Sequence, residues 1–205
     1  SLDGDSDNAV DTLSGNDYIL FASGTTLTSA GNITLSAANG GMTTAGNLTL
    51  SAPSSITMTG TMSGTGDISL SASNGITLNN SISTSSGLLS INANSSALTL
   101  GSGVTLSSTN ALTLAASSTT SSGDLTLTSS ASTINVNNAL VSAGAVTMTA
   151  STGLTLSNST LTGSGNISLQ GGSSLSLASG TTITSSAGNI TLGASGGSIT
   201  ANGAL

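Results

Sequence analysis

The chain has 205 residues and a formal net charge of −7, because its seven acidic residues are all Asp and it contains no Lys, Arg or His. Without a cation it has no side chain to pair with phosphates, so we expect neither nucleic acid nor an anionic membrane as a partner. The lack of Lys, His and Cys excludes Schiff bases, catalytic triads and His-ligated metals. No run approaches the ~20 apolar residues that insertion across a membrane requires.

Residues 1–24 differ from the rest of the chain and are expected to form an acidic N-terminal segment that caps the fold or serves as a docking strand. Five of the seven acids lie here: Asp3, Asp5, Asp7, Asp11 and Asp17. The first four space oxygen ligands as calcium loops do, although Asn8 stands where such a loop has Gly and Ser14 where it has a bidentate Glu. Two interpretations stay open, a calcium site at Asp3, Asp5, Asp7 and Asp11 or a solvated acidic tail. No other cofactor is expected.

The single Tyr and the single Phe follow the acids, as Tyr18 and Phe21. We interpret them as a bulky plug that covers the first layer of the fold. The alternative is an ordinary first strand.

A short motif recurs along the remaining sequence, first as residues 31–35, Gly-Asn-Ile-Thr-Leu. Further copies start at residues 46, 66, 123, 144, 165 and 188, with looser ones at 87 and 110. Most starts lie 20, 21 or 23 residues apart, which is typical of a stacked solenoid. Each copy predicts a turn followed by a strand, because Gly and Asn tolerate a left-handed corner and the apolar-Thr/Ser-apolar triplet alternates with period two.

Two further sets of strands fall between these copies, one about eight residues after each motif and a weaker one near Leu27, Met62 and Ile183. Three short strands in a coil of about 20 residues predict an all-β fold, a parallel β-helix over residues 25–205. In each triplet the outer residues, such as Ile33 and Leu35, should point inward and the middle Thr or Ser outward. Corner Asn side chains should bond to the backbone two residues on or to the Asn of the next coil. The stretches 31–45 and 110–122 look too short for complete coils.

These Gly-Asn-(Ile/Leu)-Thr-Leu repeats, with corners rich in Ser, Thr, Ala and Gly, resemble the repeat region of filamentous-haemagglutinin-type exoproteins and related bacterial surface adhesins. The resemblance covers roughly residues 25–205 and rests on the residue types of the repeat and on its period, not on a diagnostic motif. The Asn-Pro-Asn motifs of that family's secretion domain do not occur. The resemblance implies an extracellular, right-handed parallel β-helix from a bacterium that serves as a shaft, fibre or adhesive surface.

Catalysis is not expected. With Asp as the only charged residue type, the only catalytic pair that the chain could form is a pair of carboxylates. Asp67 and Asp124 occupy what look like equivalent corners of different coils, where Asp simply replaces Asn. An adhesive site for a glycan or receptor would need an aromatic platform or a long loop, and the sequence shows neither.

The C-terminal residues 198–205 look like a coil that stops midway. Two accounts fit: a second copy docks there head-to-tail, through Tyr18, Phe21, Ile199 and Leu205, or the chain is part of a longer solenoid. The alternative function is ice binding by a Thr/Ser-rich face, although no strict Thr-x-Thr column is visible in the sequence.

Overall fold

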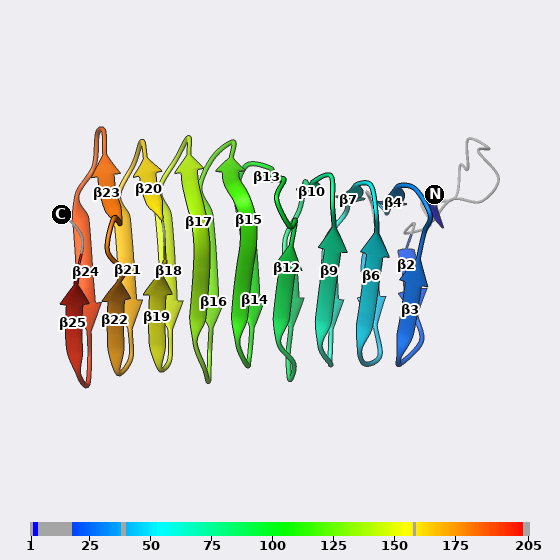
Figure 1. Cartoon of the computed structure of the whole chain (residues 1–205). Helices are drawn as coiled ribbons and strands as arrows, with labels where there is room; N and C mark the ends of the chain where they lie inside the picture. Colours follow the sequence, from blue (N-terminus) through cyan, green and yellow to red (C-terminus); the bar gives the residue numbers. More distant parts are fainter. Residues whose placement is uncertain (1, 4–17, 38–39, 158, 203–205) are drawn as a thin grey trace.

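A computed structural model describes residues 2–3, 18–37, 40–157 and 159–202, and these residues form a single elongated stack of β-strands (Figure 1). Every strand pairs in parallel with the strand one coil before it or after it, and the described residues contain no helix. The strands lie across the long axis of the rod, with residue 2 near one end and residue 202 near the other. The prediction of an all-β parallel solenoid with three strands per coil is confirmed.

Three stacks of strands, here called faces 1, 2 and 3, form the sides of the rod. Two strands, β15 (Leu112–Ser121) and β17 (Ile134–Ser142), run around the corner between faces 1 and 2 and belong to both. In addition to the first parts of β15 and β17, face 1 consists of β3 (Thr25–Thr28), β6 (Leu48–Ala52), β9 (Ile68–Ala72), β12 (Leu89–Asn92), β19 (Gly153–Leu156), β22 (Ser174–Leu177) and β25 (Ser198–Ala201).

Face 2 contains the second parts of β15 and β17. Its other strands are β1 (Leu2–Asp3), β4 (Ile33–Ser36), β7 (Ile56–Thr59), β10 (Ile76–Leu78), β13 (Ala97–Leu100), β20 (Thr160–Gly163) and β23 (Thr182–Ser185).

Face 3 is a separate nine-stranded sheet. It consists of β2 (Tyr18–Phe21), β5 (Gly41–Thr44), β8 (Met62–Gly64), β11 (Ile82–Thr84), β14 (Val104–Ser108), β16 (Leu125–Ser129), β18 (Val146–Ala150), β21 (Ile167–Gly171) and β24 (Ile190–Ala194).

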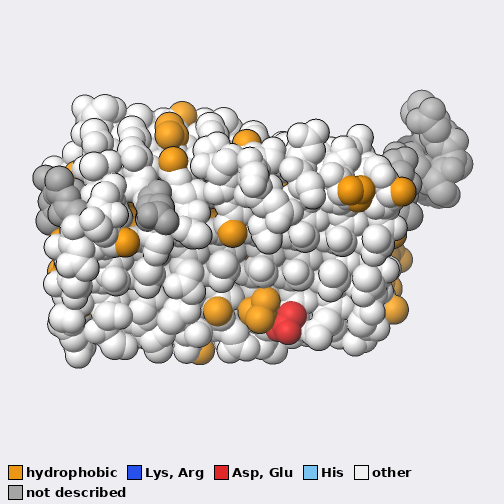
Figure 2. All heavy atoms as spheres, in the orientation of Figure 1, with side chains coloured by type: hydrophobic (Ala, Val, Ile, Leu, Met, Phe, Trp, Pro, Cys, Tyr) orange, Lys and Arg blue, Asp and Glu red, His pale blue; other side chains and the backbone are white. Residues whose placement is uncertain are grey.

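The core is a set of aliphatic columns that run along the axis of the rod. In β6, Leu48 and Leu50 are fully buried while Thr49 between them reaches solvent, as the period-two alternation predicts. Leu48 pairs in register with Ile68 of the next coil, and Leu50 with Leu70. Each fully buried aliphatic side chain stabilises the fold by about 1.5–3 kcal/mol relative to an exposed one. The surface is correspondingly polar, with only scattered apolar side chains on the face that Figure 2 shows.

In most copies of the Gly-Asn motif the glycine is required for space and not for a left-handed backbone, which corrects the expectation from the sequence. None of these motif glycines has a positive φ; the described residues with positive φ lie in other turns, such as Gly24 and Asn94. A Cβ on Gly66 would lie 2.6 Å from the carbonyl carbon of Gly46 and 2.7 Å from the backbone nitrogen of Asn47, both in the preceding coil. At this corner successive coils therefore approach so closely that a Cβ would not fit without a shift of the backbone.

The motif does not stay at one corner of the triangle, and this explains the two stretches that looked short. Asn32 lies between faces 1 and 2, Asn47 between faces 3 and 1, and Asp124 between faces 2 and 3. Between the copies at residues 31 and 46, and again between those at 110 and 123, the chain passes along two faces and not three. Each interval is therefore two-thirds of a coil. Residues 31–45 contain only β4 and β5, and residues 110–122 contain only β15, which spans two faces, so each stretch does lack one strand of a coil. The stack itself is unbroken, because the missing strand lies beyond the next copy of the motif.

Candidate functional site

The two acids whose side chains the structure describes hold adjacent coils together. Oδ1 of Asp67 accepts a hydrogen bond from the backbone N–H of Leu88, at 3.0 Å, and Oδ1 of Asp124 accepts one from Ala145, at 2.8 Å. Each acceptor binds the residue that follows the corner glycine of the next coil. The two carboxylates lie at different corners, so the expectation of equivalent positions is wrong.

Motif Asn side chains make the same contact. Oδ1 of Asn47 accepts from the N–H of Asp67, at 2.9 Å, and Oδ1 of Asn166 accepts from that of Asn189, also at 2.9 Å. Asx side chains thus form short ladders along the corners, each bonded to the backbone of the next coil. The expected bond to the backbone two residues on is not the contact that these residues make.

Buried hydroxyl groups line the lumen beside the corners. Thr44, Ser108 and Ser129 end strands of face 3 and are almost fully buried. Oγ of Ser108 donates to the carbonyl of Asn110 at 2.8 Å, and Oγ of Ser129 donates to the same carbonyl at 2.7 Å. These side chains satisfy corner carbonyls that would otherwise lose their hydrogen bonds on burial.

One buried polar pair interrupts the aliphatic column of face 2. Thr119 is fully buried between Leu98 and Leu140, and its Oγ1 accepts a hydrogen bond from Nδ2 of Asn138 at 2.6 Å. Oδ1 of Asn138 is buried and has no hydrogen-bond partner. An unpaired buried acceptor is costly, so this pair is a local weakness of the stack.

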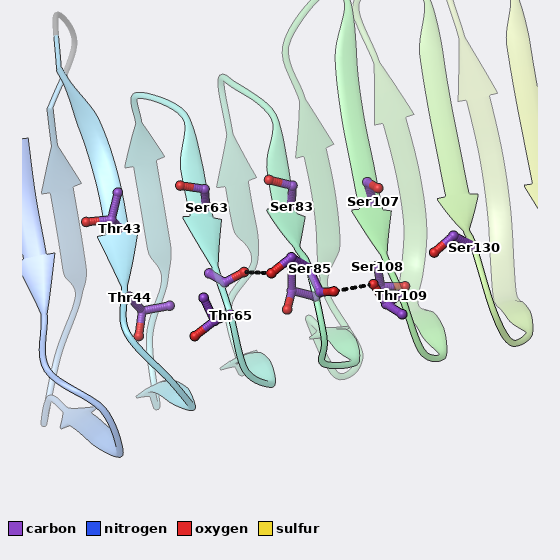
Figure 3. A pocket seen from close by; sticks show the side chains of 12 residues that line it. Thr43, Thr44, Ser63, Thr65, Ser83, Ser85, Ser107, Ser108, Thr109 and Ser130 are labelled. Carbon is purple, nitrogen blue, oxygen red and sulfur yellow. Dashed lines mark hydrogen bonds between the residues drawn. The ribbon is translucent and has the colours of Figure 1, made fainter.

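A shallow groove of about 640 Å³ runs along the rod over β5, β8, β11 and β14 (Figure 3). Its lining is Ser, Thr and Gly alone: Thr43, Thr44, Ser63, Gly64, Thr65, Ser83, Thr84, Ser85, Ser107, Ser108, Thr109 and Ser130. Several hydroxyls already bond to the backbone of the preceding coil, as Oγ1 of Thr109 does to the carbonyl of Ser85 at 2.7 Å. The groove offers hydroxyl groups as hydrogen-bond donors and acceptors, and none of its lining residues carries a charge.

The outer surface of face 2 carries a column of Thr that sequence reasoning missed. Strand pairing brings seven Thr into one line, interrupted once by Val141: Thr34, Thr57, Thr77, Thr99, Thr120, Thr162 and Thr184. All seven reach solvent. The Gly-Asn motif changes corner along the chain. When strands are grouped by their distance from the motif, these Thr residues therefore fall into all three groups, and the column is not seen. Aligning the coils by strand pairing would have revealed the column.

The acidic residues proposed to bind calcium fall outside what the structure shows. Asp5, Asp7 and Asp11 lie outside the described residues, and Asp3 is described only through its backbone in β1, where it pairs with Ser36. Among the described residues there is no group of three or more His, Cys, Asp or Glu. Calcium binding at the N-terminal segment stays a prediction.

The residues expected at a subunit interface have different surroundings. Phe21 points into the lumen and is 5% exposed, whereas Tyr18, three residues earlier in β2, points outward and is 62% exposed. Only Phe21 can therefore act as a plug of the lumen. Ile199 is 46% exposed in the last strand, and Leu205 lies outside the described residues.

The comparison with known families bears on the first coils. Two adjoining stretches, residues 2–37 and 36–84, match the family model of the haemagglutinin repeat. The resemblance to filamentous haemagglutinin is confirmed. No curated protein and no solved structure gives a significant match. Haemagglutinin repeats occur in secreted and surface-exposed bacterial adhesins, where they are typically non-catalytic.

The coils beyond the matched haemagglutinin repeats keep the same architecture. The strands of residues 89–202 stack in register on those of residues 18–84 through all three faces. The described residues include no helix of the length and apolarity that a membrane crossing would need.

Proposed function

We propose that the chain is a structural shaft segment of a secreted or surface-exposed bacterial fibre or adhesin, with no catalytic role of its own. The observation that carries the proposal is the continuity of the stack: aliphatic columns join coil to coil over the described length, and short corner Asx ladders add bonds between several neighbouring coils. In such a solenoid each coil contacts only its neighbours, so adding coils adds length without changing the cross-section.

The charge of the chain agrees with an extracellular shaft. No Lys or Arg is present, so trypsin-like proteases have no cleavage site. The described surface is dominated by hydroxyl and amide groups, which neither attract nucleic acid nor insert into lipid. End-on association with further coils, from a second copy or from a longer chain, is part of this proposal.

Surface labelling tests the proposal. Bacteria that produce the protein with an epitope tag in the exposed corner at Gly103, where a Cβ would meet no neighbouring atom, are labelled with antibody while intact and after treatment with proteinase K. We expect label on intact cells that proteinase K removes, with a tagged cytoplasmic protein as the negative control. Label that appears only after lysis would contradict the proposal.

A second candidate, ice binding, has one observation in its favour, the Thr column of face 2. Thr side chains spaced by the strand repeat of ~4.8 Å present methyl and hydroxyl groups in a regular row on a flat surface. The experiment is to measure thermal hysteresis of the protein and of Thr77→Tyr, with Ser69→Tyr on face 1 as the matched control. Ice binding predicts hysteresis that only the Thr77 variant loses, and no hysteresis in the unmodified protein would dismiss this candidate.

A further inference from the structure

The turn between β9 of face 1 and β10 of face 2 contains an Asn-Gly pair, Asn74 and Gly75. The sequence has three such pairs, and this is the one whose two residues both lie in the described part of the chain. Gly75 has a φ of 100°, a conformation that L side chains rarely adopt, so the turn itself requires Gly. Because Gly has no Cβ, its backbone nitrogen is unhindered, and it directly follows the solvent-exposed side-chain amide of Asn74.

The hydrogen bonds of this turn hold its backbone and leave two polar groups free. The N–H of Asn74 donates to the carbonyl of Ser54 at 3.0 Å, and the carbonyl of Gly75 accepts from the N–H of Ile56 at 3.1 Å, both in the preceding coil. Among the described residues, neither the N–H of Gly75 nor the side chain of Asn74 has a hydrogen-bond partner. The two groups can therefore approach each other without breaking a contact between coils.

Asn residues of the Gly-Asn motif differ in both respects. Oδ1 of Asn47 accepts from the N–H of Asp67, and the N–H of Leu48, the residue after Asn47, donates to the carbonyl of Asp67 at 2.8 Å. The same two contacts hold Asn166 and the residue that follows it. At these corners the next coil thus engages both the side-chain amide and the backbone nitrogen behind it.

We propose that Asn74 is a site of spontaneous deamidation, in which the backbone nitrogen of Gly75 attacks Cγ of Asn74. The nitrogen loses its proton to solvent and bonds to Cγ, and the bond from Cγ to Nδ2 breaks with release of ammonia. Water then opens the resulting five-membered succinimide ring. Addition of water at Cγ gives aspartate, and addition at the backbone carbonyl carbon gives isoaspartate, in which the main chain continues through Cγ.

The surroundings of the turn make this change compatible with an intact rod. The succinimide lacks the N–H of Gly75, which makes no contact between coils. The turn also lies outside the strands, since β9 ends at Ala72 and β10 begins at Ile76. Each product adds one negative charge to a chain whose formal charge is −7. The proposal goes beyond the shaft function: the surface of the rod gains negative charge as the protein ages.

A matched control places a second Asn-Gly pair at the same corner one coil later. Asn94 lies in the turn between β12 and β13, and its Nδ2 donates to the carbonyl of Ala72 at 2.9 Å. The variant Ser95→Gly gives Asn94 the same following residue as Asn74, while the side-chain amide of Asn94 stays held. Ser95 is exposed, so the substitution removes no buried group. Any difference in rate between the two Asn then reflects the structure and not the dipeptide.

Peptide mapping measures both sites in one fragment. The folded Ser95→Gly protein is incubated at neutral pH, denatured and cut with an Asp-specific protease, which releases residues 67–123 by cleaving before Asp67 and Asp124. Tandem mass spectrometry then locates the replacement of NH₂ by OH. We expect Asn74 to deamidate about tenfold faster than Asn94 in the folded protein, and the two rates to be similar in urea, where no contact holds either amide.

The unmodified protein gives a second measurement that does not depend on the variant. Because the fold leaves Asn74 free, its deamidation rate in the folded protein should lie within about tenfold of its rate in urea. Circular dichroism checks that each sample is folded. Equal rates for Asn74 and Asn94 in the folded Ser95→Gly protein would overturn the proposal. So would an Asn74 that stays intact in the folded protein while the unfolded chain deamidates. Surface labelling of intact cells tests the shaft function separately.

Discussion

Oδ1 of Asp67 lies 3.0 Å from the backbone nitrogen of Leu88, which belongs to the next coil and donates its hydrogen to the carboxylate. The contact converts a corner side chain into a connection between coils. It also explains why both Asn and Asp occur at this position: both offer the same Oδ1 acceptor, and the second carboxylate oxygen of Asp is not needed for the bond.

This contact predicts that Asp67→Ala destabilises the protein by about 1 kcal/mol, because the half-buried N–H of Leu88 loses its acceptor. Asp67→Asn keeps an Oδ1 acceptor and should stay within about 0.5 kcal/mol of the unmodified protein. Urea denaturation followed by circular dichroism measures both variants. Equal destabilisation by the two substitutions would show that the negative charge, and not the hydrogen bond, matters at this corner.

The stacked corners predict that Gly66→Ala destabilises the protein by about 1–3 kcal/mol, because its Cβ would overlap the backbone of Gly46 and Asn47. The matched control is Gly31→Ala: this glycine occupies the same place in the motif, has no positive φ, and its Cβ would meet no atom within 4 Å. We expect Gly31→Ala to change stability by less than about 0.5 kcal/mol. Similar urea midpoints for the two variants would contradict the role given to close stacking.

Much of the fold could be predicted from the sequence because each strand carries its own inward–outward pattern. The alternation of Ile33, Thr34 and Leu35 fixes which side chains face the lumen, and the strand repeat fixes their stacking. The phase of the coil is not predictable in this way, because the Gly-Asn motif lies at different corners in different coils, as Asn32 and Asn47 show. Close packing favours Gly at two different corners, for example at Gly66 between faces 3 and 1 and at Gly144 between faces 2 and 3.

The candidate surfaces were less predictable than the fold. The Thr column of face 2 depends on register between coils, for example Thr57 against Thr77, and no local pattern states that register. The polar pair of Thr119 and Asn138 likewise joins residues that only a coil-to-coil alignment brings together. Local sequence patterns determine what one strand does, whereas surfaces along the rod depend on how neighbouring coils align.

Calcium is expected to stabilise the protein if Asp3, Asp5, Asp7 and Asp11 bind it, because a ligand that binds only the folded state raises the free energy of unfolding. The experiment compares thermal unfolding in Ca²⁺ and in EDTA, for the unmodified chain and for a variant with these four Asp changed to Asn. We expect a higher Tm in Ca²⁺ that the variant loses, and Mg²⁺ serves as the control for ionic strength. The same Tm in Ca²⁺ and EDTA would leave the acidic segment as a solvated tail.

The hydrogen bond between Thr119 and Asn138 predicts that substitutions at these two positions have non-additive effects on stability. Thr119→Val keeps the shape of the side chain but removes the acceptor for Nδ2 of Asn138, so Nδ2 joins Oδ1 as a buried polar group without a partner. We expect the free energy of unfolding to fall by about 1–3 kcal/mol.

Asn138→Ser places at this corner the residue type found there one coil later, where the hydroxyl of Ser159 donates to the carbonyl of Ser157 at 2.9 Å. The double variant Thr119→Val with Asn138→Ser should therefore recover most of that loss. A double-mutant cycle from urea denaturation measures the coupling, and strictly additive effects would show that the Thr119–Asn138 hydrogen bond contributes nothing to the stack.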